Sequence, residues 1–468
     1  MDTILVMVIG LLPIVSAVIV FASNSSKTKN NINLPNGNMG WPIIGQTLSF
    51  LKAHRSTSMA NFLEDQCSRY GKVFKCHLFG SATIVSCDYE LNLFILQNKE
   101  KLFPASYPKA MEGILGTSSL LMTFGELYRK LRDIVVSFSA MSKSNPSFLH
   151  SLQNIALSMM DSWKDYKEIA FRKQVKKFAL DLMLKTLLSI EPEEPLALKI
   201  LQDFLTYMKG FVSLPVEFFK NKQQARARLS STVGEIIKGR EEEKRRKGDF
   251  LEVILSKGGV SDEEKVSTVL DILLAGYETS STLISLIVYF LGHSPLAFQS
   301  FKKEHQSIRK SKAQQDKYLD FKDYQKMEFT QNVINEAMRC GNIVKFVHRK
   351  ATQDVKCKGV IPSGWKALPI LAAAHFDTSL PQNPFDFDPW RWTNSKKVII
   401  PFGGGPRLCP GAELAKVETA FFLHHIVLNY RCKVKPDDFP MAYPYVEFQQ
   451  GLCWKLKWNI FSISPLPF

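Results

Sequence analysis

The sequence lacks the short motifs that mark several common protein classes. Its 8 cysteines include no pair at C-x-x-C spacing, which argues against a zinc knuckle or a thioredoxin-type redox site. Eight cysteines among 468 residues are also far fewer than a disulfide-stapled secreted scaffold carries, so a reducing compartment is favoured. No G-x-G-x-x-G or other nucleotide-binding fingerprint is present, and the chain is therefore not expected to bind a dinucleotide itself.

Acidic residues are scarce relative to basic ones. The 44 Asp and Glu stand against 60 Lys and Arg, which gives a formal net charge of +16. Such a surplus suits an acidic partner, which can be a nucleic acid, an anionic membrane surface or an acidic protein. The densest basic run, KGREEEKRRK at residues 238–247, has no interleaved aromatic side chains, so it indicates a solvated helix face rather than a nucleic-acid site. The apolar share of 45% excludes a disordered or low-complexity protein.

Long apolar runs are also rare, and the run at residues 4–22 is the one suited to crossing a bilayer. It carries no charge and would span roughly 28 Å as a helix, close to a ~30 Å hydrocarbon core. Lys27 and Lys29 follow it, which places the rest of the chain in the cytosol. A cleaved secretory signal is the alternative, but a basic segment before the run is missing. The sequence therefore predicts a transmembrane anchor at residues 1–23, a polar spacer and proline-rich hinge at 24–45, and one large domain at 46–468.

The pattern of this domain is that of a mainly α fold with small β-sheets. Residues 73–86 carry β-branched and aromatic side chains around Phe79-Gly80-Ser81, which predicts a hairpin. From about 146 to 312 the pattern is mostly helical, and residues 356–371 return to short strands.

One predicted helix is unusually long and apolar. Ser261-Asp262-Glu263-Glu264 has the form of a capping box and opens a helix of about 32 residues that ends at Gly292 and Pro295. Asp271 and Glu278 interrupt its apolar surface. We therefore expect this helix to cross the centre of a large core rather than a membrane.

The strongest chemical signal is the decapeptide Phe402-Gly403-Gly404-Gly405-Pro406-Arg407-Leu408-Cys409-Pro410-Gly411. Three successive glycines allow the backbone to take positive φ and to approach another group closely. Cys409 stands where this segment leads into a helical pattern, and backbone N–H groups stabilise a thiolate near a helix start. With no second Cys or His at ligand spacing, the arrangement fits one axial thiolate on a haem iron better than a zinc site. A glycine-rich turn around an ordinary buried cysteine is the alternative.

This decapeptide resembles the haem-binding signature of the cytochrome P-450 family. Glu336-Ala337-Met338-Arg339 is similar to the family's Glu-x-x-Arg helix, and Arg391 lies in a segment similar to the element that completes an ion triad with that pair. The resemblance covers residues 34–465 and implies a cytochrome P-450 fold with a single haem domain and haem b as cofactor. It implies that Cys409 is the axial ligand of the haem iron and that Phe402 belongs to the cofactor site. Two guanidiniums can satisfy one buried carboxylate, so a triad of Glu336, Arg339 and Arg391 is physically reasonable.

The long helix carries Ala275-Gly276-Tyr277-Glu278-Thr279-Ser280, which resembles the family's oxygen-activation motif. The resemblance implies that the small residues leave room for dioxygen, while Thr279 and Glu278 relay protons. A threonine that only bonds back to the preceding turn is the alternative. The family pattern also implies that Arg132, Arg349 and Arg407 face the haem propionates. Tyr128 stands where relatives usually carry Trp or His, so its part in that contact is left open.

Other segments, including Ser106-Tyr107-Pro108-Lys109 and Phe346-Val347-His348-Arg349-Lys350, are similar to the plant microsomal clan that hydroxylates sterols and terpenoids, with brassinosteroid 22-hydroxylases nearest. The resemblance implies a single-pass monooxygenase of the endoplasmic reticulum membrane that uses O2 and electrons from NADPH through a cytochrome reductase. No nucleic acid is expected to bind. The acidic reductase would dock on basic residues near the cysteine, namely Arg129, Lys130, Lys350 and Lys416.

The expected substrate is a small hydrophobic sterol or triterpenoid that enters from membrane lipid. By family position its pocket is apolar and is lined by Leu115, Leu121, Phe211, Ala275, Val344, Phe346 and Val347. Oxidation of another plant terpenoid or hormone is one alternative, and a non-catalytic haem sensor or a haem-thiolate isomerase is another. Thr279 and Glu278 argue against the sensor and Thr279 against the isomerase, because neither of these needs proton delivery to dioxygen.

Overall fold

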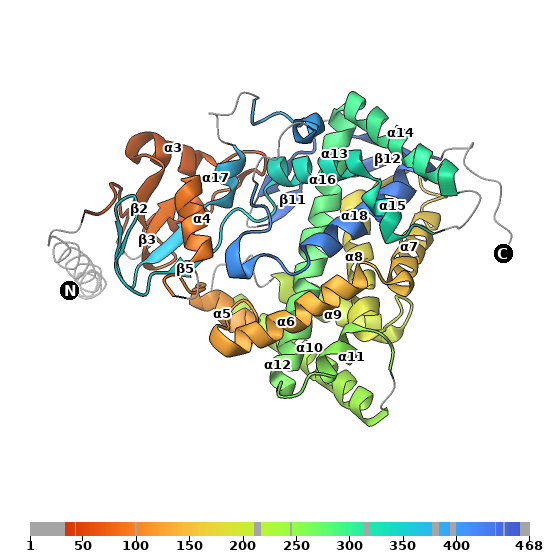
Figure 1. Ribbon diagram of the computed structural model, residues 1–468, viewed down its shortest axis with the longest axis horizontal. Coiled ribbons are helices and arrows are strands. Elements are labelled where there is room, and N and C mark those ends of the chain that lie inside the picture. Colours follow the sequence, from red (N-terminus) through yellow and green to blue (C-terminus); the bar gives the residue numbers. More distant parts are fainter. Residues whose placement is uncertain are drawn as a thin grey trace, which may run out of the picture.

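The computed structural model is shown in Figure 1. It describes residues 33–42, 44–98, 101–209, 217–243, 246–312, 318–376, 383–393, 399–435, 437–442 and 445–458. The anchor predicted at 1–23 and the pocket residue Phe211 lie outside the described residues. The strands β2 (Val73–Leu78), β3 (Ser81–Ser86) and β5 (Arg349–Lys350) lie toward the end marked N, and a larger helical part, which also holds β12 (Cys453–Trp458), extends toward the end marked C (Figure 1). The expectation of a mainly α fold with small β-sheets is confirmed.

The helices include short 3-10 and π segments. They are α2 (Thr47–Phe50), α3 (Asn61–Tyr70), α4 (Tyr89–Gln97), α5 (Lys109–Leu115), α6 (Gly125–Ser142), α7 (Pro146–Asp161), α8 (Phe171–Leu188), α9 (Pro195–Met208), α10 (Glu217–Glu243), α11 (Phe250–Leu255), α12 (Asp262–Ala275), η2 (Gly276–Ser280), α13 (Ser281–His293), α14 (Pro295–Lys312), α15 (Phe321–Gln325), α16 (Glu328–Gly341), α17 (Leu371–His375), η3 (Pro389–Trp392), η4 (Gly405–Arg407) and α18 (Ala412–Asn429).

The strands are short and form four sheets in the described part of the chain. They are β1 (His54–Arg55), β2 (Val73–Leu78), β3 (Ser81–Ser86), β4 (Glu168–Ala170), β5 (Arg349–Lys350), β6 (Val355–Lys356), β7 (Val360–Ile361), β8 (Lys366–Pro369), β9 (Tyr430–Val434), β10 (Pro440–Ala442), β11 (Val446–Phe448) and β12 (Cys453–Trp458). Their orders are β2-β3-β8-β5, β1-β10-β11, β4-β12-β9 and β6-β7.

The hairpin predicted at residues 73–86 is confirmed. β2 and β3 pair antiparallel, with Val73 opposite Ser86 and Leu78 opposite Ser81. The two turn residues, Phe79 and Gly80, both have positive φ, at 51° and 74°. Such turns match the right-handed twist of the flanking strands. The strands expected around residues 356–371 are also present as β6, β7 and β8, and β8 pairs in parallel with β3.

Backbone hydrogen bonds attach the first described residues to two of the sheets, at β2 and at β7. Lys75 N donates to Asn36 O, and Val360 N donates to Asn33 O, each at 3.0 Å. These backbone bonds join residues 33 and 36 to the body of the protein, and the domain boundary expected at residue 46 stays a prediction.

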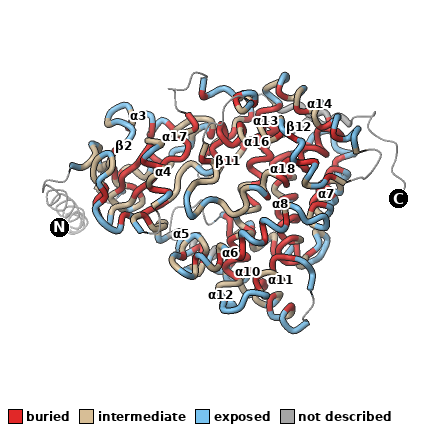
Figure 2. Tube along the Cα trace, viewed as in Figure 1, coloured by how far each residue is buried: buried red, intermediate tan, exposed pale blue. Residues whose placement is uncertain are grey.

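The long apolar helix predicted from the capping box is confirmed. Ser261 Oγ accepts from Glu264 N at 3.3 Å, and Glu264 Oε2 accepts from Ser261 N at 2.8 Å. The segments α12, η2 and α13 run continuously over 32 residues, Asp262–His293, through the centre of the molecule (Figure 1). Within the described part of the chain this is the helix whose length and composition would allow it to cross a membrane, yet 67% of its apolar window is buried in the protein. Figure 2 shows the same helix surrounded by other buried segments.

The final long helix, α18, places the candidate site. It packs against α7, α14, α16 and η2 in the helical core. The segment that leads into it contains η4, which contacts α4 on the β-rich side. The cysteine segment therefore bridges the two parts of the molecule.

Candidate active site

The cysteine loop, residues 399–411, packs its backbone closely against α4. Gly403 and Gly405 have φ of 75° and 63°, a region that glycine enters at little cost. A Cβ on Gly405 would meet Leu96 O and Gln97 Cα, whereas a Cβ on Gly403 would meet nothing within 4 Å. Gly404 is extended, with φ of −165°. The three successive glycines therefore have different structural requirements.

Cys409 lies at the end of this loop, just before α18. Its N–H donates to Phe402 O at 3.0 Å, which closes the loop on itself, and its thiol is free of any disulfide. Burial raises the pKa of the Cys409 thiol, while the Gly411 N–H and Arg132 act to lower it. A thiol that coordinates a metal ion is deprotonated outright, so this half-buried sulfur suits a metal-bound thiolate better than a free one.

Three arginines from separate elements converge beside the cysteine loop. Arg132 lies on α6, Arg349 on β5 and Arg407 in η4. The Nε atoms of Arg349 and Arg407 are buried and make no hydrogen bond among the described residues. Burial lowers the pKa of Arg407 to about 10, and the neighbouring Arg349 and Arg132 add to the decrease. Buried cations that repel one another need an anionic partner, and the two propionates of a haem meet this need.

Tyr128 orients this arginine cluster. Its hydroxyl donates to Pro406 O at 3.0 Å and accepts from Arg132 Nη1 at 3.3 Å. The Arg407 guanidinium carbon lies 4.1 Å from the centre of the Tyr128 ring, a cation–π geometry. The phenol proton is thus committed to Pro406, and the contribution of Tyr128 here is to position Arg132 and Arg407.

The middle of the long helix presents a small open face. Ala275 is exposed although Leu273 and Tyr277 are buried. The next residues form the π-helical turn η2, and such turns are frequent at functional sites. Thr279 Oγ1 donates to Ala275 O at 2.6 Å, so the back-bonded geometry that the sequence left as an alternative is present. The hydroxyl oxygen still has lone pairs with which to accept a bond from another donor.

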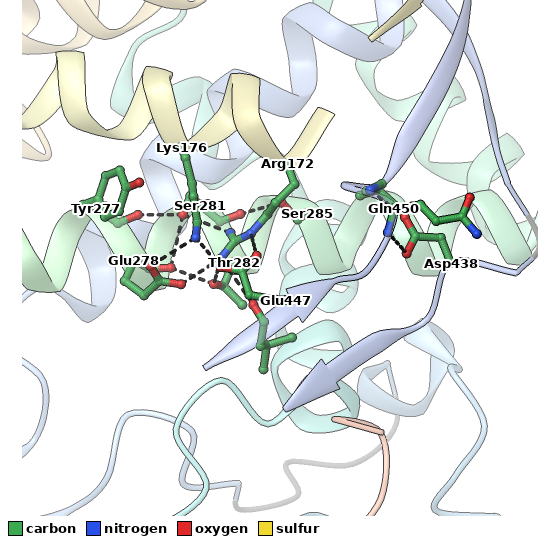
Figure 3. Close-up of polar contacts among 12 residues, drawn as sticks. Arg172, Lys176, Tyr277, Glu278, Ser281, Thr282, Ser285, Asp438, Glu447 and Gln450 are labelled. Carbon is green, nitrogen blue, oxygen red and sulfur yellow. Dashed lines mark hydrogen bonds and ion pairs between the residues drawn. The ribbon is translucent and has the colours of Figure 1, made fainter. Parts of the chain in front are cut away.

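Glu278 belongs to a buried ion-pair network (Figure 3). Its Oε1 accepts from Arg172 Nη2 at 2.8 Å, and its Oε2 lies 3.5 Å from Lys176 Nζ. Both cations extend from α8 toward η2 (Figure 3). Arg172 also donates to Ser281 Oγ, Thr282 Oγ1 and Glu447 Oε2. Any proton relay that uses Glu278 must therefore work through this network.

The structure brings Glu336, Arg339 and Arg391 together in the core. Arg339 donates to both oxygens of Glu336, at 2.9 and 2.8 Å, and Arg391 Nε donates to Oε1 at 3.3 Å. Asp388 N and Trp392 Nε1 donate to the same carboxylate at 2.9 and 3.0 Å. The three charged side chains are at most 4% exposed. This cluster fixes α16 to η3.

The residues expected to line the pocket lie in different environments. Five are exposed or half-buried, namely Leu121, Ala275, Val344, Phe346 and Val347. Leu115 is buried, and Phe346 packs against Phe50 with ring centroids 5.1 Å apart. Packing alone accounts for these two side chains.

Comparison with known proteins identifies the family. Residues 35–449 match the profile of the family described as Cytochrome P450. The chain belongs to the cytochrome P450 family. Cytochrome P450 724B1 from Oryza sativa subsp. japonica is 53% identical to this P450 over 439 residues, which cover 90% of this chain and 91% of the relative.

Other relatives extend this match. A cholesterol 22-monohydroxylase from Paris polyphylla is 39% identical over 457 residues, covering 94% of this chain and 97% of the relative. The solved structure of retinoic acid bound cyanobacterial CYP120A1 has a TM-score of 0.81 and 25% identity to this P450, covering 92% of this chain and 100% of that chain. As a cytochrome P450, the protein is a monooxygenase whose cofactor is haem b, and the arginine cluster beside Cys409 fits that cofactor.

Two sets of polar contacts in this P450 were not predicted from the sequence, namely the partners of Glu278 and the partners of Asp271. Arg172 and Lys176, which bind Glu278, come from a helix about a hundred residues earlier, so no local pattern connects them. Asp271 was noted as a charge interrupting an apolar helix, and that position was a signal that it needs partners. Its partners, Ser119 and Leu120, lie 152 and 151 residues away.

Proposed function

We propose that this P450 is a membrane-anchored steroid hydroxylase that acts on the side chain at C22 in brassinosteroid biosynthesis. The observation that carries the chemistry is the half-buried Cys409 beside the arginine cluster, in which the Nε atoms of Arg349 and Arg407 have no hydrogen-bond partner among the described residues. The steroid substrate is supported by the cholesterol 22-monohydroxylase that matches over 97% of its own length.

The cofactor would be held from three sides. Cys409 would supply the thiolate ligand, and Arg132, Arg349 and Arg407 would hold the propionates. Phe402 packs on the main core and accepts the Cys409 N–H through its carbonyl oxygen, which keeps the sulfur in a fixed orientation. When bound, the haem supplies the activation of dioxygen and the insertion of one oxygen atom into a C–H bond.

Proton delivery is assigned to Thr279 and Glu278. The Thr279 hydroxyl lies on the open face beside Ala275, where its oxygen can accept a hydrogen bond from a bound ligand or water. Glu278 is linked through Arg172 and Lys176 to Glu447, whose side chain is 46% exposed. We infer that protons enter from solvent at Glu447 and Lys176 and reach the open face through Glu278.

The membrane and the electron donor complete the proposal. The anchor at 1–23 would hold the protein on the endoplasmic reticulum with its haem domain in the cytosol, and a cytochrome reductase would deliver electrons from NADPH. Of the basic residues expected at the docking face, Lys416 pairs with Glu413 and Lys130 donates to Gly259 O. Arg129 and Lys350 are exposed, and we assign the reductase contact chiefly to them.

A spectral titration followed by product analysis tests the substrate. Membranes that contain the full-length protein are titrated with cholesterol, with 22-hydroxycholesterol and with a plant triterpene, and the haem spin state is recorded. Turnover with reductase, NADPH and labelled dioxygen then identifies the product by mass spectrometry. We expect a spin shift with cholesterol and one labelled oxygen at C22. The absence of a shift with any sterol, or oxygen at another carbon, would overturn the substrate assignment. Membranes carrying Cys409→Ala give the background.

A further inference from the structure

The loop that joins α5 to α6, residues 116–124, is hydrogen-bonded to two other parts of the protein through the backbone of one residue, Leu120. Leu120 N donates to Asp271 Oδ2 at 2.6 Å, and Leu120 O accepts from Arg407 Nη1 at 3.3 Å. Asp271 belongs to the long helix, whereas Arg407 belongs to the cysteine loop. The peptide units on either side of Leu120 therefore connect the oxygen-activation helix to the cofactor site.

Asp271 is the buried member of this connection. It is 9% exposed and also accepts from Ser119 Oγ at 2.9 Å. Two charged or titratable groups on other helices lie close enough to interact with its carboxylate, Arg226 on α10 and Tyr207 on α9. Arg226 Nη2 does not pair with it but donates to the carbonyl oxygen of Leu115, the last residue of α5 before the loop, at 2.9 Å.

Arg407 holds the opposite side of the loop. Besides Leu120 O, its guanidinium donates to Leu121 O at 2.9 Å and to Thr123 O. The carbonyls of three loop residues thus converge on one arginine that also belongs to the propionate cluster. Leu121 is among the proposed pocket residues, so the loop forms part of the pocket wall.

We propose that Asp271 is a positioning residue that anchors the 116–124 loop as a wall of the substrate pocket, and that Leu120 couples this wall to the cofactor site through Arg407. The anchoring stands on the described contacts alone, whereas the effect on substrate rests on the proposed function. Asp271 touches no reacting atom, and its effect on the reaction passes entirely through the loop.

The chemistry of the carboxylate gives this role a pH signature. Burial raises the pKa of Asp271 to about 7, although the Leu120 N–H, Ser119 Oγ and Arg226 act to lower it. Above pH 7 the ionised carboxylate accepts two charge-assisted hydrogen bonds from the loop, and below pH 7 the neutral acid holds it more weakly. Asp271→Asn has the shape of the neutral acid at every pH.

Hydrogen exchange on the haem-loaded, full-length protein without substrate tests the anchoring. The peptide that spans residues 116–124 is followed in the wild type, in Asp271→Asn, and in Ser119→Ala. The Ser119→Ala change leaves the long helix intact and removes the bond to Asp271 together with the bond that Ser119 Oγ accepts from Leu121 N at 3.2 Å. Glu263→Gln is the matched control, because Glu263 Oε1 accepts from Ser118 Oγ at 2.9 Å on the exposed side of the same loop. We expect protection to fall about tenfold in Asp271→Asn, less in Ser119→Ala and not in Glu263→Gln. Equal protection in Asp271→Asn and Glu263→Gln would overturn the anchoring.

A steroid spectral titration between pH 6 and 8 tests the link to substrate. The dissociation constant of the wild type should rise several-fold as pH falls through 7, while Asp271→Asn should have the higher value throughout and no pH dependence. Loss of protection without any change in affinity would overturn the role in the pocket. If the wild type bound no steroid at all, the proposed function would fail while the exchange result still decided the anchoring.

Discussion

Each of the three successive glycines in the cysteine loop meets a different steric environment. Gly405 has positive φ and a backbone oxygen, Leu96 O, where a Cβ would lie. Gly403 has positive φ, but a Cβ there would meet nothing within 4 Å. Gly404 is extended, and a Cβ there would lie 3.6 Å from its nearest neighbour, Leu96 Cδ1. Backbone atoms cannot move aside as a flexible side chain can, so position 405 should tolerate substitution least.

A series of alanine variants tests this ranking. We expect Gly405→Ala to lose most of its bound haem, Gly403→Ala to lose stability by about 1 kcal/mol from the strained φ, and Gly404→Ala to resemble the wild type. Haem content per mole of protein and the thermal midpoint measure the two effects. Equal haem loss at positions 404 and 405 would contradict the close approach between the cysteine loop and α4.

Arg172 is a single residue on which a buried network depends. Removing it leaves the Glu278 carboxylate in the core with Lys176 alone, 3.5 Å away. We expect Arg172→Met to lower the free energy of unfolding by about 3 kcal/mol, because a buried charge loses its closest partner. On the same helix, Lys177 pairs with Asp181 while 57% exposed, so Lys177→Met should cost less than about 1 kcal/mol. Urea unfolding compares the two, and similar costs would argue against a buried ion pair.

The elements of the fold differ in how far local sequence determines them. The capping box at Ser261, the length of the following helix and the two-residue hairpin turn at Phe79 are set by contiguous residues, and all three were predictable. The π-helical turn η2 was not, because its residues do not distinguish a π-helical turn from an α-helical one. This turn lies where α8 and α18 both contact the long helix. The Glu336 cluster was suggested by family resemblance, whereas the Arg172 network depends on tertiary contacts that no local pattern records.

Gly276, at the start of η2, tests how tightly α8 packs on this turn. A Cβ there would meet Met183 Sδ and Cγ, so Gly276→Ala should cost about 1–3 kcal/mol by overpacking. In a double-mutant cycle with Met183→Ala, the added methyl should fill part of the space vacated by the sulfur and give a favourable coupling of at least about 1 kcal/mol.

A helical glycine in open surroundings provides the control for this cycle. A Cβ on Gly234 of α10 would lie 3.9 Å from its nearest neighbour, Val266 Cγ2. Gly234→Ala should therefore leave the stability of the protein unchanged or raise it. Zero coupling between positions 276 and 183 would contradict the close contact.

The core of the protein contains three buried histidines, His305, His424 and His425. Burial favours their neutral form, so protonating them should destabilise the fold. His305 Nδ1 lies 3.0 Å from His424 Nδ1, and His425 Nε2 lies 3.1 Å from Gln153 Oε1. Burial lowers the pKa of His305 to about 3 and of His425 to about 4, and it lowers the pKa of His424 as well. In the unfolded chain these groups bind protons near pH 6.5, whereas in the folded chain they do not until the pH is much lower.

Stability should therefore fall as pH drops from 6.5 toward 4. At pH 5, His305 and His425 should each lower the free energy of unfolding by about 2 kcal/mol relative to its value at pH 7. His425→Gln should reduce the pH dependence of the unfolding free energy between pH 6 and 4.5 by an amount equal to the uptake of about one proton. His150→Gln, at an exposed position, should leave this pH dependence unchanged. Thermal midpoints followed by far-ultraviolet circular dichroism give the slope. A slope that is the same in the wild type and in His425→Gln would contradict the buried neutral state.

The most direct measurement is the absorption spectrum of the reduced protein under carbon monoxide. Thiolate ligation by Cys409 predicts a Soret band shifted to long wavelength in the wild type and in Cys357→Ala, a half-buried cysteine on the β-rich side. Cys409→Ala should lack this band while its circular dichroism shows an intact helical fold. If Cys409→Ala kept the shifted band, or if the wild type never showed it, the assignment of residue 409 as the haem ligand would be wrong.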